Sequence, residues 1–146
     1  MEGIKGILKA IKNNYHIILG LATLIIIITT LFLSRHDLKN AKKNSKYTIA
    51  YITSNWHQKN NNGVGTDFTY EVNGEKIEKT CANNLEKGTR YIVLYDSIAP
   101  KNYIMLYNHP LPDSIKRPLN GWKFNEVPVK LDSSDLKQYF QVLKLD

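Results

Sequence analysis

The stretch IILGLATLIIIITTLFL, residues 17–33, decides how the rest of the chain is organised. Its 17 residues include no Asp, Glu, Lys or Arg. Because an α-helix rises about 1.5 Å per residue, roughly 17 to 25 apolar residues cross a hydrocarbon core about 30 Å thick. The run therefore predicts a transmembrane helix over residues 15–34, with Ile17, Leu24 and Leu33 among the membrane-spanning residues.

The apolar run is longer than the core of a secretory signal peptide, which is typically about 7 to 15 residues. It ends at Ser34-Arg35 without small residues in the pattern of a cleavage site. These features favour an uncleaved signal anchor and a single-pass protein. The 17 Lys against 3 Arg are typical of an AT-rich bacterial genome, so the expected location is the bacterial cell (inner) membrane.

The positive charge lies beside the apolar run. Residues 1–46 hold eight Lys and Arg against two acidic residues, so they carry +6 of the total +7 and the remaining 100 residues carry +1. Juxtamembrane lysines contact anionic lipid head groups and bias membrane topology. The expected lipid contacts are Lys5, Lys9, Lys12, Arg35, Lys39, Lys42, Lys43 and Lys46.

The side of the membrane stays undecided. Five of these basic residues follow the run and three precede it, so the count slightly favours a cytoplasmic domain, although a short tail with three lysines is itself awkward to translocate. Residues 1–14 have apolar residues at helical spacing (Ile4, Ile7, Leu8, Ile11). They form either an amphipathic helix in the interface or an extension of the same helix. Residues 35–46 are a basic linker or a short continuation of the helix.

A stripe of mostly small residues follows one side of the expected membrane helix: Gly20, Thr23, Ile27 and Thr30. Small residues let two helices approach closely, so one interpretation is a homodimer face. The other is that Gly and Thr are ordinary residues of membrane helices.

From Tyr47 the apolar residues alternate with polar ones, which is the pattern of β-strands. Asn73-Gly74 between two alternating runs is a strong hairpin signal, because both residues accept positive φ. The run at 90–95 predicts the central, most buried strand, and Pro128 predicts an edge position for a strand at 127–131. The expected strands are 47–56, 68–72, a return strand through 77, 90–95, 103–107 and 127–131, with a loop at 59–65.

These elements predict a small, mostly antiparallel β domain over residues 47–131, with about five strands in a barrel-like or curled sheet. Asp132-Ser-Ser-Asp then precedes apolar residues at helical spacing, which predicts a capped amphipathic helix at 132–146.

Two segments, TYEVNGEKI (69–77) and KGTRYIVLYD (87–96), followed by Pro100, carry a resemblance. They resemble a bacterial domain-of-unknown-function family of membrane-tethered small β domains, whose pattern is a Tyr-x-Val-x-Gly hairpin, then Gly, Val-x-Tyr and Pro. The resemblance covers roughly residues 47–107 and implies the fold and the membrane tether. It implies no catalytic residue.

Candidate chemistry is sparse. Cys81 is the one cysteine, so no intrachain disulfide forms, and it could act as a nucleophile only with a base such as His57 or His109. The same histidines with Asp113 make a thin metal-ligand set, and neither a metal nor a cofactor is expected. Trp56, His109 and Trp122 lie beside loops or prolines and are the candidate contacts to a partner.

The expected function is therefore the presentation of a small β domain for protein–protein contact from a bilayer, without an enzymatic activity. One alternative is a membrane-anchored enzyme, either a hydrolase that uses Cys81 with a histidine or a metal-dependent hydrolase. The other is a module that binds anionic lipid or nucleic acid, which would need a basic face on a domain that carries only +1; nucleic acid is not expected.

Overall fold

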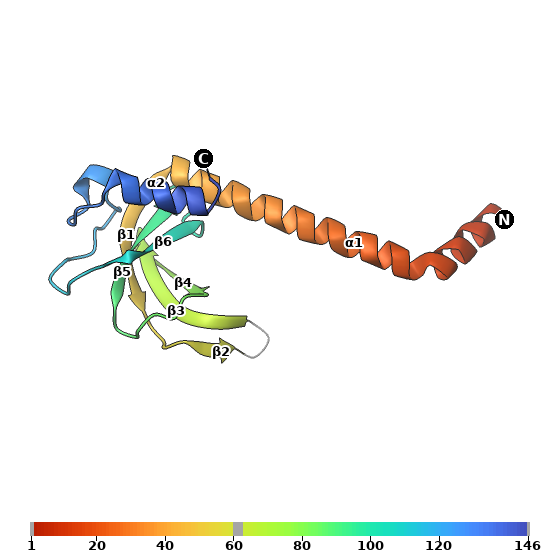
Figure 1. The fold of residues 1–146 in the computed structure, drawn as a ribbon, viewed down its shortest axis with the longest axis horizontal. Coiled ribbons are helices and arrows are strands. Elements are labelled where there is room, and N and C mark those ends of the chain that lie inside the picture. The colour runs from red at the N-terminus through yellow and green to blue at the C-terminus, as the bar shows by residue number, and fades with distance from the viewer. Residues whose placement is uncertain (1, 60–62, 146) are drawn as a thin grey trace. The chain divides into compact units, whose positions relative to one another are not determined.

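The computed structural model describes residues 2–59 and 63–145. The chain divides into two compact units, residues 1–36 and residues 37–146, and each is described by itself. The first is entirely helical, and the second holds the sheet and the remaining helices (Figure 1).

Helix α1 (Glu2–Lys43) contains the apolar run. It bends at Asn14, whose φ of −120° and ψ of 18° are not helical, so the basic segment before this residue is separated from the apolar segment after it (Figure 1). The part of α1 from Lys12 to Lys43 is long and apolar enough to cross a membrane. All its described side chains up to residue 36 are exposed.

Of the two interpretations of residues 35–46, a linker or a short continuation of the helix, the structure has the continuation. Helix α1 continues through Lys43, and strand β1 begins at Ser45. The helix persists because Ala41 is fully buried in the core of the second unit and Leu38 packs against it. This apolar contact stabilises the last turns of a segment whose composition is otherwise polar and basic.

The second unit is built on an antiparallel sheet of six strands: β1 (Ser45–Ile52), β2 (His57–Lys59), β3 (Gly63–Val72), β4 (Glu75–Cys81), β5 (Arg90–Asp96) and β6 (Tyr103–Pro110). Strands β4, β3, β1, β5 and β6 lie in that order, and β2 pairs with the first residues of β3 on the side that faces β1. The expected small antiparallel sheet of about five strands, barrel-like or curled, is observed as an antiparallel sheet of six described strands. It is not closed, and its outer strands are β4 and β6.

Two strand predictions are confirmed. Asn73 (φ 53°) and Gly74 (φ 83°) form the two-residue turn between β3 and β4, with Val72 opposite Glu75. Strand β5 pairs with β1 on one edge and with β6 on the other, and six of its seven residues are buried.

Several boundaries differ from the prediction. Strand β1 ends at Ile52 instead of reaching Trp56, and 127–131 is not a strand. Strand β2 ends at the first residue of the predicted loop 59–65, and β3 begins inside this loop, at Gly63. Strand β3 pairs with residues 50–52 of β1, and Trp122 pairs with the same strand at Tyr47. The main chains of Trp122 and Tyr47 exchange hydrogen bonds of 2.8 and 2.9 Å. Val127 and Val129 pack half-buried against the core beside the short helix η1 (Phe124–Glu126).

Both faces of the central strands are buried. One face, which includes Ile49, Ile92 and Leu106, is covered by the end of α1, by the segment after β6 and by helix α2 (Ser133–Val142). The other face, which includes Val93 and Met105, joins one apolar cluster with residues of β3 and β4. This burial on both faces is the reason that β5 reads as a nearly continuous apolar run.

The C-terminal helix was predicted at 132–146 and is observed at Ser133–Val142. Asp132 caps it by accepting a hydrogen bond of 2.9 Å from the Ser134 N–H. This side-chain acceptor satisfies one of the amides that the first turn of a helix leaves unpaired.

Candidate functional site

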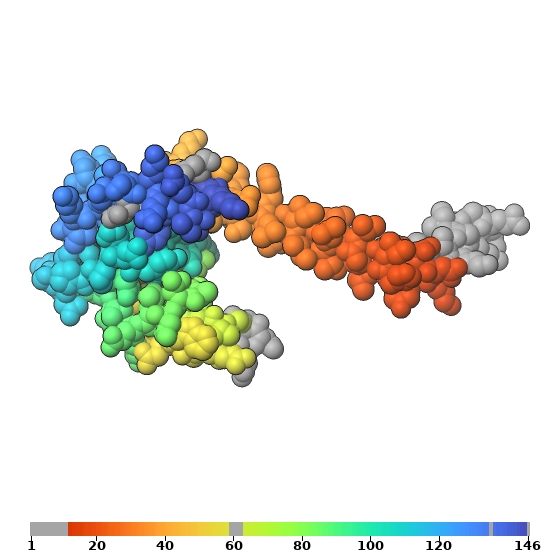
Figure 2. Space-filling view, viewed as in Figure 1, coloured from red at the N-terminus to blue at the C-terminus, as the bar shows by residue number. Residues whose placement is uncertain are grey.

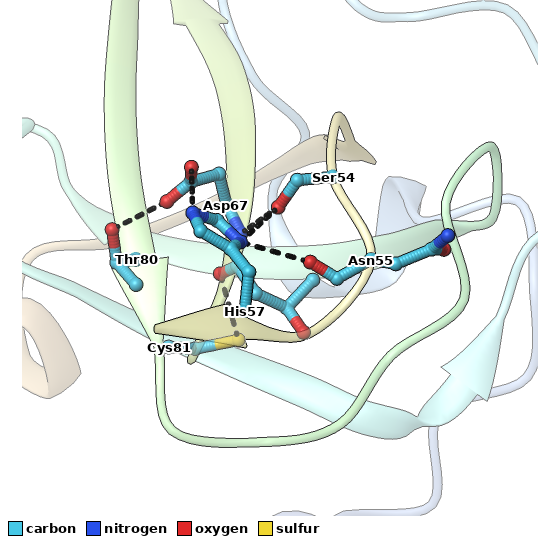
Figure 3. Close-up of polar contacts among 7 residues, drawn as sticks. Ser54, Asn55, His57, Asp67, Thr80 and Cys81 are labelled. Carbon is cyan, nitrogen blue, oxygen red and sulfur yellow. Dashed lines mark hydrogen bonds and ion pairs between the residues drawn. The ribbon is translucent and has the colours of Figure 1, made fainter. Parts of the chain in front are cut away.

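A cluster of polar side chains lies where the chain turns from β1 into β2 (Figure 3). Residues 53–56 form this corner beside Asp67 of β3: Thr53 and Ser54 donate their N–H groups to the Asp67 carbonyl (2.9 and 3.4 Å). In return, the Ser54 hydroxyl accepts the Asp67 N–H at 2.9 Å. These three hydrogen bonds fix the corner to the main chain of β3 without any ion pair.

His57 extends the cluster. Its Nε2 lies 3.4 Å from Oδ2 of Asp67, and its Nδ1 lies 3.0 Å from the carbonyl of Asn55 and 3.3 Å from the Ser54 hydroxyl. The other carboxylate oxygen of Asp67 accepts a hydrogen bond of 2.6 Å from Thr80 on β4. Three strands are thus connected through one carboxylate (Figure 3).

The cluster holds a serine, a histidine and an aspartate. Nδ1 of His57 lies 3.0 Å from the Asn55 carbonyl and 3.3 Å from the Ser54 hydroxyl, and the tautomer of the ring decides whether Nδ1 donates to the carbonyl or accepts from the hydroxyl. Because Asp67 contacts both His57 and Thr80, the cluster connects β2, β3 and β4, and we call it the clasp.

Cys81 ends β4, and its thiol donates weak hydrogen bonds to the carbonyls of Thr66 (3.6 Å) and Asn83 (3.9 Å). Burial raises the pKa of the Cys81 thiol, and the negative charge of Asp67 raises it further. Within the described chain, none of the hydrogen bonds of Cys81 reaches an imidazole. His57 lies on β2 and His109 on β6. The thiol is consequently held in its protonated, less nucleophilic form.

The described residues also contain no group of three or more His, Cys, Asp or Glu placed to hold a metal ion. Asp113, which the sequence offered as a ligand, instead pairs with Arg90 at 3.1 Å. The nearly buried Arg90 guanidinium also donates to the carbonyls of Pro112 and Ile115 (3.1 Å for the latter), so it fixes the segment after β6.

The three candidate partner contacts have different surroundings. Trp56 lies at the β1–β2 corner and is 50% exposed. Trp122 is half-buried and packs on the core, with its main chain paired to Tyr47, and His109 is half-buried on β6. Trp56 is therefore the one that the structure leaves accessible for a partner.

The basic residues predicted to contact lipid also divide. Lys42 donates to the Leu145 carbonyl at 3.2 Å and lies over the Phe140 ring, and Lys46 donates to the Asn120 carbonyl at 2.9 Å. These two take part in packing the second unit. Lys12, Arg35, Lys39 and Lys43 are exposed, while the side chains of Lys5 and Lys9 lie outside the described residues.

In the predicted helix–helix stripe, Thr23 and Thr30 donate their hydroxyls to the carbonyls four residues earlier, at 2.9 and 2.8 Å. These hydroxyls are satisfied inside the helix. A Cβ atom added at Gly20 would have no other atom within 4 Å, and Ile27 is 50% exposed. The stripe therefore fits a homodimer face and also an ordinary membrane helix.

Aromatic rings connect the two halves of the open sheet. Phe68 and Tyr70 of β3 lie 5.2 and 5.9 Å from Tyr103 of β6, measured between ring centroids. Tyr70 donates its hydroxyl to the Pro100 carbonyl at 2.5 Å. Burial raises the pKa of Tyr103 to about 12 and also raises that of Tyr70. These rings are core and cross-strand contacts, as alternation along the strands predicts.

A groove follows the outer edge of β6, and we call it the β6 groove. It consists of two hollows of about 300 and 270 Å³ that share Tyr107 and Leu143. The first is bordered by β6, the end of α1 and residues 80–83, and the second lies between β6 and α2. Figure 2 shows the dark blue surface of α2 bordering the cyan surface of β6. Among the described residues, none of those that line either hollow is charged.

Sequence reasoning identified neither the clasp nor the β6 groove. The sequence offers His57 as a base for Cys81 or as a metal ligand with His109 and Asp113, and it does not indicate the contact with Asp67. The groove forms only where β6, α2 and residues 80–83, which are distant in sequence, meet. Comparison of the chain with protein-family models, with curated proteins and with solved structures gave no match.

Proposed function

We propose that the chain is a single-pass protein of the bacterial inner membrane that presents its β domain for contact with another protein. The observation that carries the proposal is the uncharged run Ile17–Leu33, which lies inside a continuous helix with exposed side chains and leads without a linker into the domain. An exposed apolar surface of this length is stable in lipid and costly in water.

Details of α1 support the anchor. Thr23, Thr29 and Thr30 donate their hydroxyls to carbonyls of the same helix, and a bilayer demands such internal partners. The bend at Asn14 lets the basic segment before it lie along the membrane surface, where its lysines meet anionic head groups. The count of basic residues on the two sides favours a cytoplasmic domain.

The chemistry of the domain supports contact over catalysis. Burial disfavours the thiolate of Cys81, and the thiol donates its weak hydrogen bonds to the carbonyls of Thr66 and Asn83. The domain offers instead an uncharged groove and an exposed tryptophan at the β1–β2 corner. Grooves of this kind and exposed aromatic residues are typical of binding surfaces.

The test is site-specific photocrosslinking in cells, with a benzophenone amino acid placed in the full chain at Trp56, at Val142 or at Leu119. Val142 and Leu119 are 76% and 85% exposed, so the label leaves the core intact. We expect a protein adduct in the membrane fraction from Trp56 or Val142 and none from Leu119. The absence of an adduct at both Trp56 and Val142 would contradict the proposal.

A further inference from the structure

The outer edge of β6 carries main-chain groups that no described strand pairs with. Asp96 donates to the Asn102 carbonyl at 2.9 Å, and Leu111 donates to the Arg90 carbonyl at 2.8 Å. Hydrogen bonding alternates along an antiparallel strand, so Asn102, Ile104 and Leu106 face β5 up to the register shift between Tyr91 and Ile92. Beyond this shift, Leu111 faces β5. The N–H and C=O groups of Tyr103 and Met105 therefore point away from the sheet.

Of these two residues, Met105 is the one that is buried. Met105 is only 2% exposed, and it lines the first hollow of the β6 groove. Buried main-chain groups are nearly always hydrogen-bonded in folded proteins. Further along the edge, the Asn108 N–H is taken by the Tyr139 hydroxyl of α2 at 3.0 Å, so a side chain already occupies the place of a strand partner there.

The opposite edge of the sheet, strand β4, approaches β6 at Tyr103. The Tyr103 hydroxyl donates to the Thr80 carbonyl of β4 at 3.4 Å, which closes the gap at that end. The first hollow of the β6 groove lies beside this contact and is also bordered by Leu38, Cys81 and Leu143. The space is thus bounded by one strand edge, the end of a second strand and two helices.

We propose that the β6 groove binds an extended polypeptide segment of a partner protein, which pairs with β6 as an additional strand. This inference rests on the function proposed above and specifies the mode of contact. Strand addition uses main-chain hydrogen bonds for affinity and takes alternate side chains into pockets, and a groove between a strand edge and a helix is suited to it.

The lining defines the chemistry of the segment. Tyr107, Tyr139, Val142 and Leu143 present aromatic and aliphatic surface without charge, so the side chains that point toward α2 are apolar. A second copy of the chain fits less well, because α2 borders the edge in every copy and pairing two β6 edges brings two α2 helices together. A single extended segment brings no second α2 helix to this edge.

The test selects linear eight-residue peptides from a random displayed library, with the full chain in lipid nanodiscs as the target. We expect enriched peptides with alternating apolar residues, whose affinity falls at least tenfold for Val142→Lys and is unchanged for Leu119→Lys. Both positions are exposed and apolar, and only Val142 lines the groove. Circular dichroism verifies that both variants fold.

N-methylation of the peptide backbone distinguishes strand pairing from side-chain binding. Methyl groups on alternate amides, those that face β6, should abolish binding, and methyl groups on the intervening amides should not. The Met105 amide should exchange its hydrogen more slowly when the peptide is bound. A library without enriched peptides, equal binding to Val142→Lys, or binding that tolerates methylation at every position would overturn the inference.

The photocrosslinking result separates this inference from the function on which it rests. An adduct from Trp56 without groove-binding peptides would overturn strand addition and leave protein contact supported. No adduct from Trp56 or Val142 would contradict both.

Discussion

The hydroxyl of Tyr103 on β6 lies 3.4 Å from the main-chain oxygen of Thr80 on β4, so one side chain connects the two free edges of the open sheet. Phe68 and Tyr70 of β3 pack against the same ring. This aromatic contact lets a sheet without closure bury a second core between β3 and the central strands.

Alkaline pH should destabilise the domain through Tyr103. Burial raises the pKa of its phenol from 10.0 to about 12, so between these values the unfolded chain loses the proton and the folded chain keeps it. Stability is therefore complete below pH 10 and falls as the pH rises toward 12. Tyr103→Phe should reduce this loss by about 1–3 kcal/mol, measured by urea unfolding at successive pH values. An unchanged pH slope in this variant would refute the assignment.

The thiol of Cys81 should react slowly. Because burial raises its pKa, less thiolate is present at neutral pH than for an exposed cysteine. The control is a chain with Cys81→Ser and Leu119→Cys, which places the thiol at a position that is 85% exposed. Alkylation by iodoacetamide should be slower for Cys81 and should accelerate at higher pH than in the control. Equal rate profiles would show that the thiol is not sheltered.

Two glycines with positive φ should respond differently to alanine. Gly121 (φ 73°) packs against the buried ring of Tyr95, with which an added Cβ would clash, whereas Gly88 (φ 90°) has open space at the same position. Both substitutions carry the backbone cost of positive φ, and only Gly121→Ala adds overpacking of about 1–3 kcal/mol. Denaturant unfolding of the two variants measures the difference. Equal destabilisation would exclude a tight contact at Gly121.

The clasp at the β1–β2 corner should contribute to stability through Asp67. Asp67→Ala removes the acceptor of the Thr80 hydroxyl and the partner of His57, and we expect a loss of about 1–3 kcal/mol. Glu78→Ala is the matched control, because its pair with Lys76 is exposed on both sides and should contribute less than about 1 kcal/mol. Similar losses in the two variants would mean that the clasp is no stronger than a surface ion pair.

Features that depend on local chemistry were predictable from the sequence. The turn at Asn73-Gly74 follows from the φ values that these residues accept, and β5 follows from an apolar run buried on both faces. Features that depend on distant segments were not. The apolar alternation at 127–131 reads as a strand, but Trp122 occupies the available position on β1, so these residues pack as irregular structure.

The same reason applies to the candidate site. The composition of 35–46 is that of a linker, and only contact with the core keeps it helical as far as Lys43. The polar segment His57–Lys59 becomes a strand because Gly63–Gly65 of β3 lies beside it. The β6 groove exists because α2 ties Tyr139 to Asn108, a contact between residues 31 positions apart. None of these pairings has a local signal.

Extraction of cell membranes with alkaline carbonate tests the anchor most directly. The full chain should remain in the membrane pellet, whereas the double variant Ile25→Lys/Ile28→Lys should be released, because each lysine near the centre of a membrane helix costs about 2.5–3.5 kcal/mol. The matched control, Ile98→Lys/Leu119→Lys, adds the same charge at exposed positions of the domain and should stay in the pellet. Release of the unaltered chain into the supernatant would contradict a membrane-spanning α1 and the function built on it.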